Sequence, residues 1–267
     1  MNSKKVLNKI FIMKISIITA TYNSEQNIAS ALESISSQTY KNVELVIIDG
    51  ASKDNTVSKI RETFTDDLKI ISEKDNGIYD ALNKGIETAT GDLIGFVHSD
   101  DFLASKDILS NIASIFQEEK VDGVYGDLQY VNKEETSKVI RYWKSEAFKP
   151  ELLKKGWMPA HPTLFLKKEV YKKHGHFNLN YNIAADYDLM LRIFSDPTLK
   201  FKYLPEVITK MRVGGASNRS LKNIKLKSLE DLRALRANGI KNPLMVLAYK
   251  NFSKLGQFVA PQPPKGE

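Results

Sequence analysis

Two adjacent carboxylates, Asp100 and Asp101, follow an apolar run at residues 93–97. The run predicts a buried strand, and the carboxyl end of a parallel strand is where open α/β sheets bind ligands. Neighbouring carboxylates repel each other, so a cation or solvent must compensate their charge, and Mg²⁺ or Mn²⁺ on a diphosphate suits such a site. The alternative is a helix N-cap with an exposed acid beside it. We expect Asp101 to be exposed and to contribute little to stability.

Two earlier strand ends carry further candidates. Tyr22 follows the strand predicted at residues 14–19, and Asp49 closes the one predicted at Val43–Asp49. A tyrosine there can stack on a base or simply occupy a turn. An acid that closes an apolar run is poorly explained by packing, which favours a ribose or base contact for Asp49. No Gly-rich dinucleotide or P-loop motif follows these strands, so those two classes lose support.

The first half of the chain alternates strands and helices. Predicted strands span 14–19, 43–49, 68–72 and 93–97, and predicted helices span 24–38, 56–64, 78–88 and 108–118. This order predicts an α/β fold with a mostly parallel sheet and helices on both faces. The second half is less regular, with strands predicted near 163–167 and 201–204 and a helix at 186–194 between them.

Composition limits the classes of protein. The 267 residues contain no cysteine, which excludes disulfides, zinc thiolate sites and cysteine nucleophiles. No apolar stretch approaches the roughly 20 residues of a membrane span. Lys4 and Lys5 resemble the start of a signal peptide, but Lys9 and Lys14 interrupt the apolar stretch that such a peptide needs. We therefore expect a cytoplasmic protein, with Met13 as an alternative start.

The net charge of +7 is concentrated at the two ends of the chain. Residues 222–267 hold nine Lys/Arg against three acids, whereas residues 14–221 carry a net charge of −2. A near-neutral body argues against a nucleic-acid partner. We expect an N-terminal extension at 1–13, a catalytic domain at 14–221 and a basic helical tail at 222–267. The tail's apolar stripe suits packing on the body, a homodimer contact or the cytoplasmic face of a membrane; it comprises Leu244, Leu247, Ala248, Phe252, Leu255 and Val259.

Five ordered motifs within residues 14–217 carry a family resemblance. They lie at 19–23, at 49–56, at 72–85, at 99–101 and across 161–192, the last with His161-Pro162-Thr163 and Ala185-Asp186-Tyr187-Asp188. Together they resemble the family 2 glycosyltransferases of the GT-A fold, most closely the bacterial subgroup that builds O-antigen, capsule and exopolysaccharide. His98 is a departure, because many relatives carry Asn or Asp there.

The resemblance implies a donor, a metal and a base. The donor would be a nucleotide-sugar, usually a UDP-sugar, and the acceptor a glycan or a polyprenyl-diphosphate-linked sugar. Asp186 would be the general base of an inverting displacement, and Asp101 would hold Mg²⁺ or Mn²⁺. His161 is a further metal or acceptor ligand, or a structural histidine. The resemblance assigns the nucleotide-sugar to Tyr22, Glu25, Asp49, Asp75, Asn83 and Asp100, and a mobile loop over it to 214–217.

Two other classes fit less well. A sugar nucleotidyltransferase needs a Gly-rich, basic loop after the first strand, and residues 19–23 do not provide one. A non-catalytic nucleotide-binding module needs neither Asp186 nor the paired acids. Asp188 and Arg192, four residues apart on the same helix, are expected to form a structural ion pair.

Overall fold

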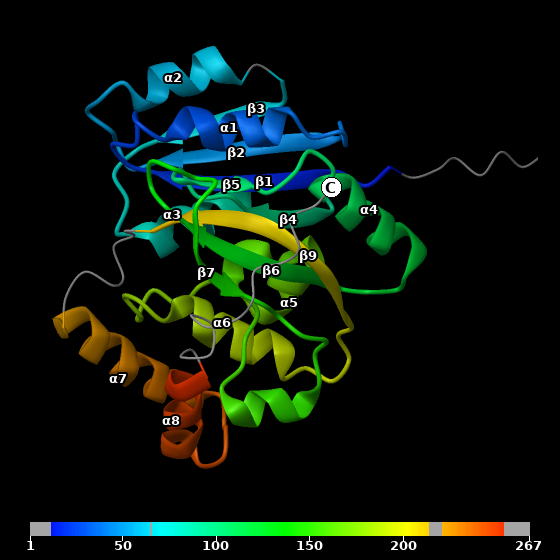
Figure 1. Ribbon diagram of the computed structural model, residues 1–267, viewed down its shortest axis with the longest axis vertical. Coiled ribbons are helices and arrows are strands. Elements are labelled where there is room, and N and C mark those ends of the chain that lie inside the picture. Colours follow the sequence, from blue (N-terminus) through cyan, green and yellow to red (C-terminus); the bar gives the residue numbers. More distant parts are fainter. Residues whose placement is uncertain (1–11, 65, 214–220, 254–267) are drawn as a thin grey trace, which may run out of the picture.

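The computed structural model describes residues 12–64, 66–213 and 221–253. Within these ranges one curled sheet has the strand order β3-β2-β1-β4-β8-β6-β9-β5, with β7 paired to β6 (Figure 1). The strands are β1 (Ile15–Thr21), β2 (Val43–Asp49), β3 (Leu68–Ser72), β4 (Leu93–Phe96), β5 (Asp101–Leu103), β6 (Gly123–Val131), β7 (Val139–Trp143), β8 (Phe165–Lys167) and β9 (Phe201–Arg212).

The first four strands in chain order form the parallel half of the sheet. Every residue of β1 is buried, as a strand covered on both faces requires. The register places Thr21 beside Asp49 and Asp49 beside Ser72. Three consecutive strands therefore end level at one edge, and the predicted α/β fold with a mostly parallel sheet is confirmed.

Helices cover both faces of the sheet and enclose two apolar cores. One core lies under α1 (Ile28–Ser36), α2 (Thr56–Thr63) and α4 (Ile108–Glu118). The other lies under α3 (Ile78–Thr88), α5 (Lys168–His174) and α6 (Ala185–Phe194). Two short 3₁₀ turns, η1 (Pro150–Lys155) and η2 (His161–Thr163), complete the second layer. Trp157 packs in an aromatic cluster with Tyr125, Phe148 and Phe194.

The second half of the sheet, which mixes parallel and antiparallel pairs, differs from the prediction. β9 runs through Arg212 instead of ending near residue 204, and it pairs with β6 in parallel. Pro205 lies inside β9 where the pairing register shifts between Tyr125 and Asp127. A bulge of this kind is how a strand tolerates a residue without a backbone N–H.

Asp101 begins a strand and not a helix. β5 pairs antiparallel with β9, and Asp101 lies opposite Met211. The next helix, α4, begins at Ile108, with Asp107 preceding it. The N-cap interpretation of the paired acids is therefore wrong.

The C-terminal segment is helical, as predicted, in its described part. Helix α7 (Leu221–Ala237) packs on α6, and α8 (Pro243–Ser253) packs on η1 and α7. Ala234, Leu235 and Val246 are fully buried. Leu255 and Val259, like residues 1–11 and 214–217, lie outside the described residues. Among the described helices, none combines the length and the apolarity that crossing a bilayer requires.

The amino-terminal edge of the sheet is closed by a buried carboxylate. Glu44 is fully buried and accepts hydrogen bonds from Ser16 Oγ at 2.5 Å and Thr90 Oγ1 at 2.7 Å. The ammonium groups of Lys69 and Lys14 lie 2.9 and 3.1 Å from its Oε2. Burial alone would raise the pKa of Glu44, but these hydrogen bonds outweigh it and lower the pKa well below its ordinary value of 4.5.

We predict that Glu44→Gln destabilises the protein in a pH-dependent way. At pH 7 the variant should lose about 3 kcal/mol of unfolding free energy, because two lysines lose their buried partner. The folded pKa is depressed, so the wild-type advantage is complete above pH 4.5 and shrinks as the pH falls below it. Urea unfolding at pH 7 and pH 4 measures this, with the exposed Glu33→Gln as control; an unchanged difference at pH 4 contradicts it.

Candidate functional site

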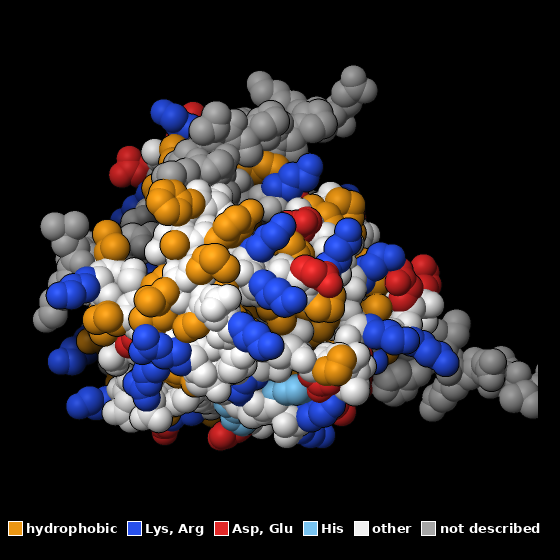
Figure 2. All heavy atoms as spheres, turned by 90° about the horizontal axis from the view of Figure 1, so that it is seen from below, with side chains coloured by type: hydrophobic (Ala, Val, Ile, Leu, Met, Phe, Trp, Pro, Cys, Tyr) orange, Lys and Arg blue, Asp and Glu red, His pale blue; other side chains and the backbone are white. Residues whose placement is uncertain are grey.

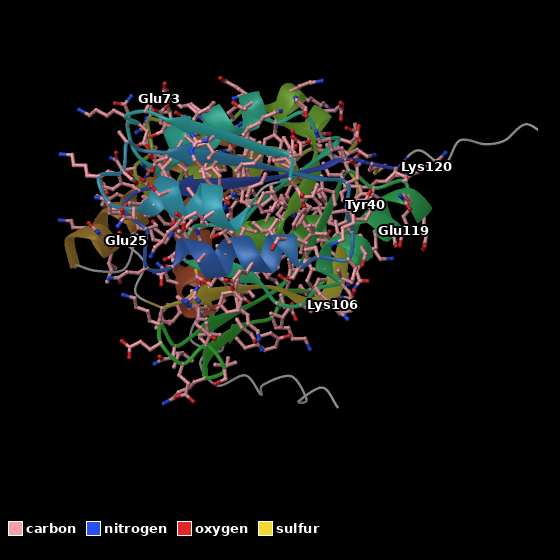
Figure 3. All side chains as sticks on the ribbon, turned by 90° about the horizontal axis from the view of Figure 1, so that it is seen from above. Glu25, Tyr40, Glu73, Lys106, Glu119 and Lys120 are labelled. Atoms are coloured by element: carbon pink, nitrogen blue, oxygen red, sulfur yellow. The ribbon has the colours of Figure 1, made fainter. Side chains whose placement is uncertain are left out.

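Most of the predicted site residues end or follow parallel strands at the carboxyl edge of the sheet, whereas Asn83 lies within α3, His161 in η2 and Asp186 at the start of α6. Figure 3 shows Glu25 and Glu73, which follow β1 and β3, at one edge, and Tyr40, Glu119 and Lys120 at the opposite edge. The amino-terminal edge, where Glu44 lies, is closed. The candidate site residues that follow the strands lie at the opposite, carboxyl edge.

Hydrogen bonds join two loops at this edge, the one after β1 and the one after β2. The backbone N–H of Asn23 donates to Ser52 Oγ at 2.8 Å, and that of Lys53 donates to Asn23 Oδ1 at 2.9 Å. Asn23 and Ala51 have φ angles of 46° and 60°, which only a few non-glycine residues adopt. Such strain persists where the surroundings over-determine it, and it is typical of ligand-binding loops.

Tyr22 and Asp75 form a shelf at Gly50. A Cβ atom built on Gly50 would lie 2.7 Å from Asp75 Oδ2 and 3.4 Å from Tyr22 Cδ2, so only glycine lets the Asp75 carboxylate lie this close to the backbone. The Tyr22 ring is 59% exposed although it follows a buried strand. An exposed ring of this kind can stack on a planar group.

Asp49 lies beneath this shelf. Its fully buried carboxylate accepts hydrogen bonds from the Ser52 N–H at 3.0 Å, the Ser52 hydroxyl and Ser72 Oγ at 2.6 Å. In this structure the carboxylate organises the loop after β2. A direct contact with a nucleotide stays a prediction.

Glu25 and Asn83 make structural contacts. Glu25 Oε2 accepts a hydrogen bond from the Asn55 N–H at 3.0 Å. The Asn83 amide donates to the Phe177 carbonyl and accepts from the Phe177 N–H, both at 2.9 Å. Glu25 thus fastens the two loops, and Asn83 fastens α3 to the segment after α5. These contacts do not test the predicted nucleotide-binding roles of Glu25 and Asn83, which stay predictions.

Asp101 is buried, and the expectation of an exposed acid is wrong. The residue is 1% exposed, and neither carboxylate oxygen has a hydrogen-bond partner among the described residues. Burial, with the neighbouring Asp100 carboxylate, raises the pKa of Asp101 well above its usual range, and Arg212 offsets part of this effect. A buried carboxylate of this kind is costly unless a cation joins it.

The donor set fits a metal held together with a substrate. Among the described residues no three His, Asp or Glu side chains come close enough to hold an ion by themselves. Mg²⁺ and Mn²⁺ sites of phosphoryl and glycosyl donors need only one or two carboxylates, because diphosphate oxygens and water complete them. Asp101 meets that requirement.

His161 lies in an aromatic pocket behind His98. Its ring is 4.9 Å from Phe96, 5.3 Å from Phe177 and 6.2 Å from His98, measured between centroids. Burial, with a smaller effect of His98, lowers the pKa of His161 to about 3, so the ring is neutral. Its buried Nε2 has no hydrogen-bond partner in the described structure. His161 belongs to no three-ligand group among the described residues, and its metal role stays a prediction.

Asp186 lies in the first turn of α6 and is half-buried. Its Oδ1 accepts a hydrogen bond from the Tyr187 N–H at 2.7 Å and lies 3.5 Å from the Tyr79 hydroxyl. Asp188, by contrast, is buried and accepts from Arg192 Nε and Asn238 Nδ2, each at 3.0 Å. The predicted ion pair with Arg192 is therefore present, and Asp186 is the acid of this helix with capacity for a further partner.

Sequence reasoning missed Tyr130 and Arg141. Burial raises the pKa of Tyr130, Arg141 offsets part of this effect, and the charges of Asp101 and Asp186 add a smaller increase. The Arg141 guanidinium lies 4.9 Å from the Tyr130 ring centre. Arg212 donates to the Asp100 carbonyl at 2.7 Å and fixes the turn between β4 and β5. The one sequence signal was the run Arg141-Tyr142-Trp143 on β7.

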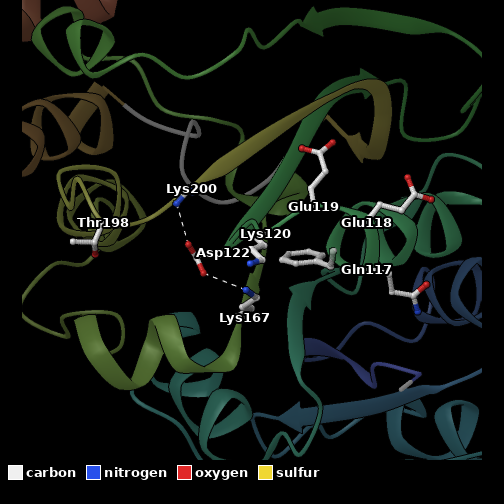
Figure 4. A pocket seen from close by; sticks show the side chains of 9 residues that line it. Gln117, Glu118, Glu119, Lys120, Asp122, Lys167, Thr198 and Lys200 are labelled. Carbon is white, nitrogen blue, oxygen red and sulfur yellow. Dashed lines mark hydrogen bonds and ion pairs between the residues drawn. The ribbon is translucent and has the colours of Figure 1, made fainter. Parts of the chain in front are cut away.

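The hollow in Figure 4 does not belong to this site. It lies at the amino-terminal end of β6, where Asp122 accepts from the Lys200 N–H at 3.0 Å and pairs with Lys167 Nζ at 3.3 Å. Asp122 therefore already has a cationic partner, unlike Asp101. A smaller hollow lies at the carboxyl edge, between Gly77–Tyr79 and Leu179–Asn182.

Comparison with known proteins agrees with this geometry. The family described as glycosyl transferase family 2 matches residues 16–177. The chain belongs to this family. A PGL/p-HBAD biosynthesis glycosyltransferase of Mycobacterium bovis is 33% identical over 209 residues, 76% of this chain and 78% of the relative. An uncharacterized glycosyltransferase of Haemophilus influenzae is 28% identical, over 78% of this chain and 68% of the relative.

Solved structures share the fold of this glycosyltransferase. S. aureus TarS 1-349 in complex with UDP-GlcNAc aligns with a TM-score of 0.64 at 19% identity, over 90% of this chain and 72% of that one. The mannosyltransferase PcManGT from Pyrobaculum calidifontis, in complex with GDP-Man and Mn²⁺, aligns with a TM-score of 0.61 at 19% identity, over 96% and 78%. At these identities the likeness shows the GT-A fold alone.

We predict that Asp101→Asn raises the melting temperature of the ligand-free enzyme at pH 8, because burial raises the pKa of Asp101 and makes its charged form costly above its ordinary pKa. A gain of 1 kcal/mol corresponds to about 2–4 °C in a chain of this size. UDP with Mn²⁺ should stabilise the wild type but not the variant. Thermal-shift assays measure both effects, and Asp122→Asn, at the opposite edge, should keep the response to UDP and Mn²⁺. A variant that still responds would remove the assignment of Asp101.

Proposed function

We propose that the protein is a metal-dependent, inverting glycosyltransferase that transfers a sugar from a UDP-sugar to a hydroxyl of a glycan or polyprenyl-diphosphate-linked acceptor in surface polysaccharide biosynthesis. The observation that carries this proposal is the carboxyl group of Asp101, which is buried at the carboxyl edge with no hydrogen-bond partner for either oxygen among the described residues. The UDP-GlcNAc of TarS and the GDP-Man and Mn²⁺ of PcManGT support the donor class and the metal by analogy.

The donor's base would stack on Tyr22. The exposed ring provides the surface, and the Asp75 carboxylate lies beside it over Gly50. Asp49 holds the loop beneath, and Asp100 follows at the next strand end toward the ribose or sugar. These assignments place the diphosphate toward Asp101, deeper in the same edge.

Asp101 would hold Mg²⁺ or Mn²⁺ on that diphosphate. The metal, when bound, supplies Lewis-acid neutralisation of the charge that develops on the leaving group. Asp186 would accept the proton of the acceptor hydroxyl as its oxygen attacks the anomeric carbon, while the bond to the nucleotide diphosphate breaks. One direct displacement inverts the anomeric centre, and no covalent nucleophile is needed.

We predict that Asp186→Asn keeps the fold and the affinity for UDP but lowers turnover by roughly 10²–10⁴, the usual contribution of a general base. UDP release from UDP-sugars with Mn²⁺, with and without acceptor, measures the reaction. A nucleotidyltransferase would instead exchange diphosphate, and chelation should abolish the UDP release.

Asp188→Asn is the matched control for that variant. It changes an acid of the same helix turn, but one already bonded to Arg192 and Asn238. It should lower stability and leave the turnover of the folded enzyme nearly unchanged. Normal turnover in Asp186→Asn, or an equal loss in both variants, contradicts the assignment of the base.

The acceptor side of the proposal rests on α8. Four of its side chains, on one side of the helix, are at least half exposed: Leu244, Met245, Tyr249 and Phe252. Val246 and Lys250 face the body instead. Figure 2 shows apolar side chains gathered over this region with basic side chains around them; the neighbouring Lys154, Lys155, Arg236 and Lys241 are exposed. An apolar face ringed by cations suits an anionic bilayer carrying a lipid-linked acceptor.

We predict that Leu244→Ser/Met245→Ser/Phe252→Ser weakens binding to phosphatidylglycerol vesicles at least about tenfold, because each side chain loses roughly 1.5–3 kcal/mol of burial. Donor hydrolysis should stay unchanged. Vesicle co-sedimentation measures binding, with the exposed Ile140→Ser as control. Unchanged binding, or a dimer that the triple variant dissociates, would assign this face to another partner.

A further inference from the structure

The segment before α6 has backbone groups held by two other helices. Glu230 of α7 is buried, and its Oε1 accepts from the Asn182 N–H at 2.9 Å. Its Oε2 accepts from the N–H groups of Ile183 at 2.8 Å and Ala184 at 3.0 Å. From α3, the Tyr79 hydroxyl donates to the Ile183 carbonyl at 2.6 Å.

These contacts hold the turn that leads into α6. Ala184 occupies the N-cap position and has no side chain that could accept a hydrogen bond. The amides at the start of a helix have no partner within the helix, and a carboxylate is a favourable acceptor for them. Glu230, from α7, accepts from the N-cap amide of Ala184 and from the two amides before the helix, and Ala184 lies two residues before Asp186.

We infer that Glu230 is a positioning residue for the proposed base: it fixes the entry of α6, so that Asp186 meets the acceptor hydroxyl in one orientation. This inference rests on the proposed function. A misplacement of a catalytic group by about 1 Å can lower the rate 10²-fold, so the contacts that fix the entry of α6 should affect turnover. The role differs from that of Asp231, the next residue, which pairs with Lys250 at 2.9 Å and fastens α8.

The test is Glu230→Gln in the full chain. An amide of the same size loses the charge and at least one acceptor, because its NH₂ group meets a backbone N–H. We expect kcat for transfer to fall about ten- to hundredfold, with the donor KM and the affinity for UDP within about twofold of the wild type. Hydrogen exchange of the amides at 182–187 should become faster.

Two comparisons separate positioning from general stability. Asp231→Asn removes a buried carboxylate from the same helix, and it should lower the melting temperature without lowering kcat. Glu230→Gln introduced into the Asp186→Asn enzyme should cost little further turnover, because a residue that acts only through the base has nothing left to position.

The outcomes are distinct. An equal loss of kcat in Glu230→Gln and Asp231→Asn, or an additive loss in the double variant, overturns the positioning role while Asp186 stays assigned. Normal turnover in Asp186→Asn alone overturns the proposed base itself, whatever Glu230→Gln does. Glu230→Ala extends the series if it folds, and it should be slower than Glu230→Gln.

Discussion

The candidate site depends most on one buried carboxyl group. Asp101 is buried at the carboxyl edge of the sheet with neither oxygen hydrogen-bonded to the described protein. Burial raises its pKa, and Arg212 offsets this only in part. The protein holds the carboxylate there because β5 pairs with β9 and draws the strand end inward. A charge kept at such a cost is typical of a site that awaits a cation and an anionic substrate.

The buried acids at the two edges of the sheet have opposite pKa shifts. Glu44, at the amino-terminal edge, is surrounded by hydroxyls and two lysines, which lower its pKa. That edge is closed and stabilises the fold. At the carboxyl edge hydrogen bonds join the loops after β1 and β2, but the Asp101 carboxylate has no hydrogen-bond partner among the described residues. Stability and function are thus assigned to different ends of the same strands.

The parallel half of the fold could be predicted because its strands are covered on both faces and its helices carry clear apolar periodicity. β9 could not be predicted in full, because Pro205 interrupts its pattern and a register shift accommodates it. The burial of Asp101 depends on pairing with that strand, so residue spacing suggested an exposed acid. The candidates Tyr22, Asp100 and Asp186 came from strand ends and family motifs, and their roles stay predictions. Glu230 was not, because an acid on a basic helix is usually exposed to solvent.

Central to the proposed mechanism is the role of Asp101 in holding the metal that accompanies the donor. Electron paramagnetic resonance of Mn²⁺ titrated into the enzyme, with and without UDP, tests this role most directly. The wild type should take up Mn²⁺ tightly only when UDP is present, since the protein alone offers too few ligands, and Asp101→Asn should lose that uptake. Equal uptake by the two proteins in the presence of UDP would contradict the role of Asp101.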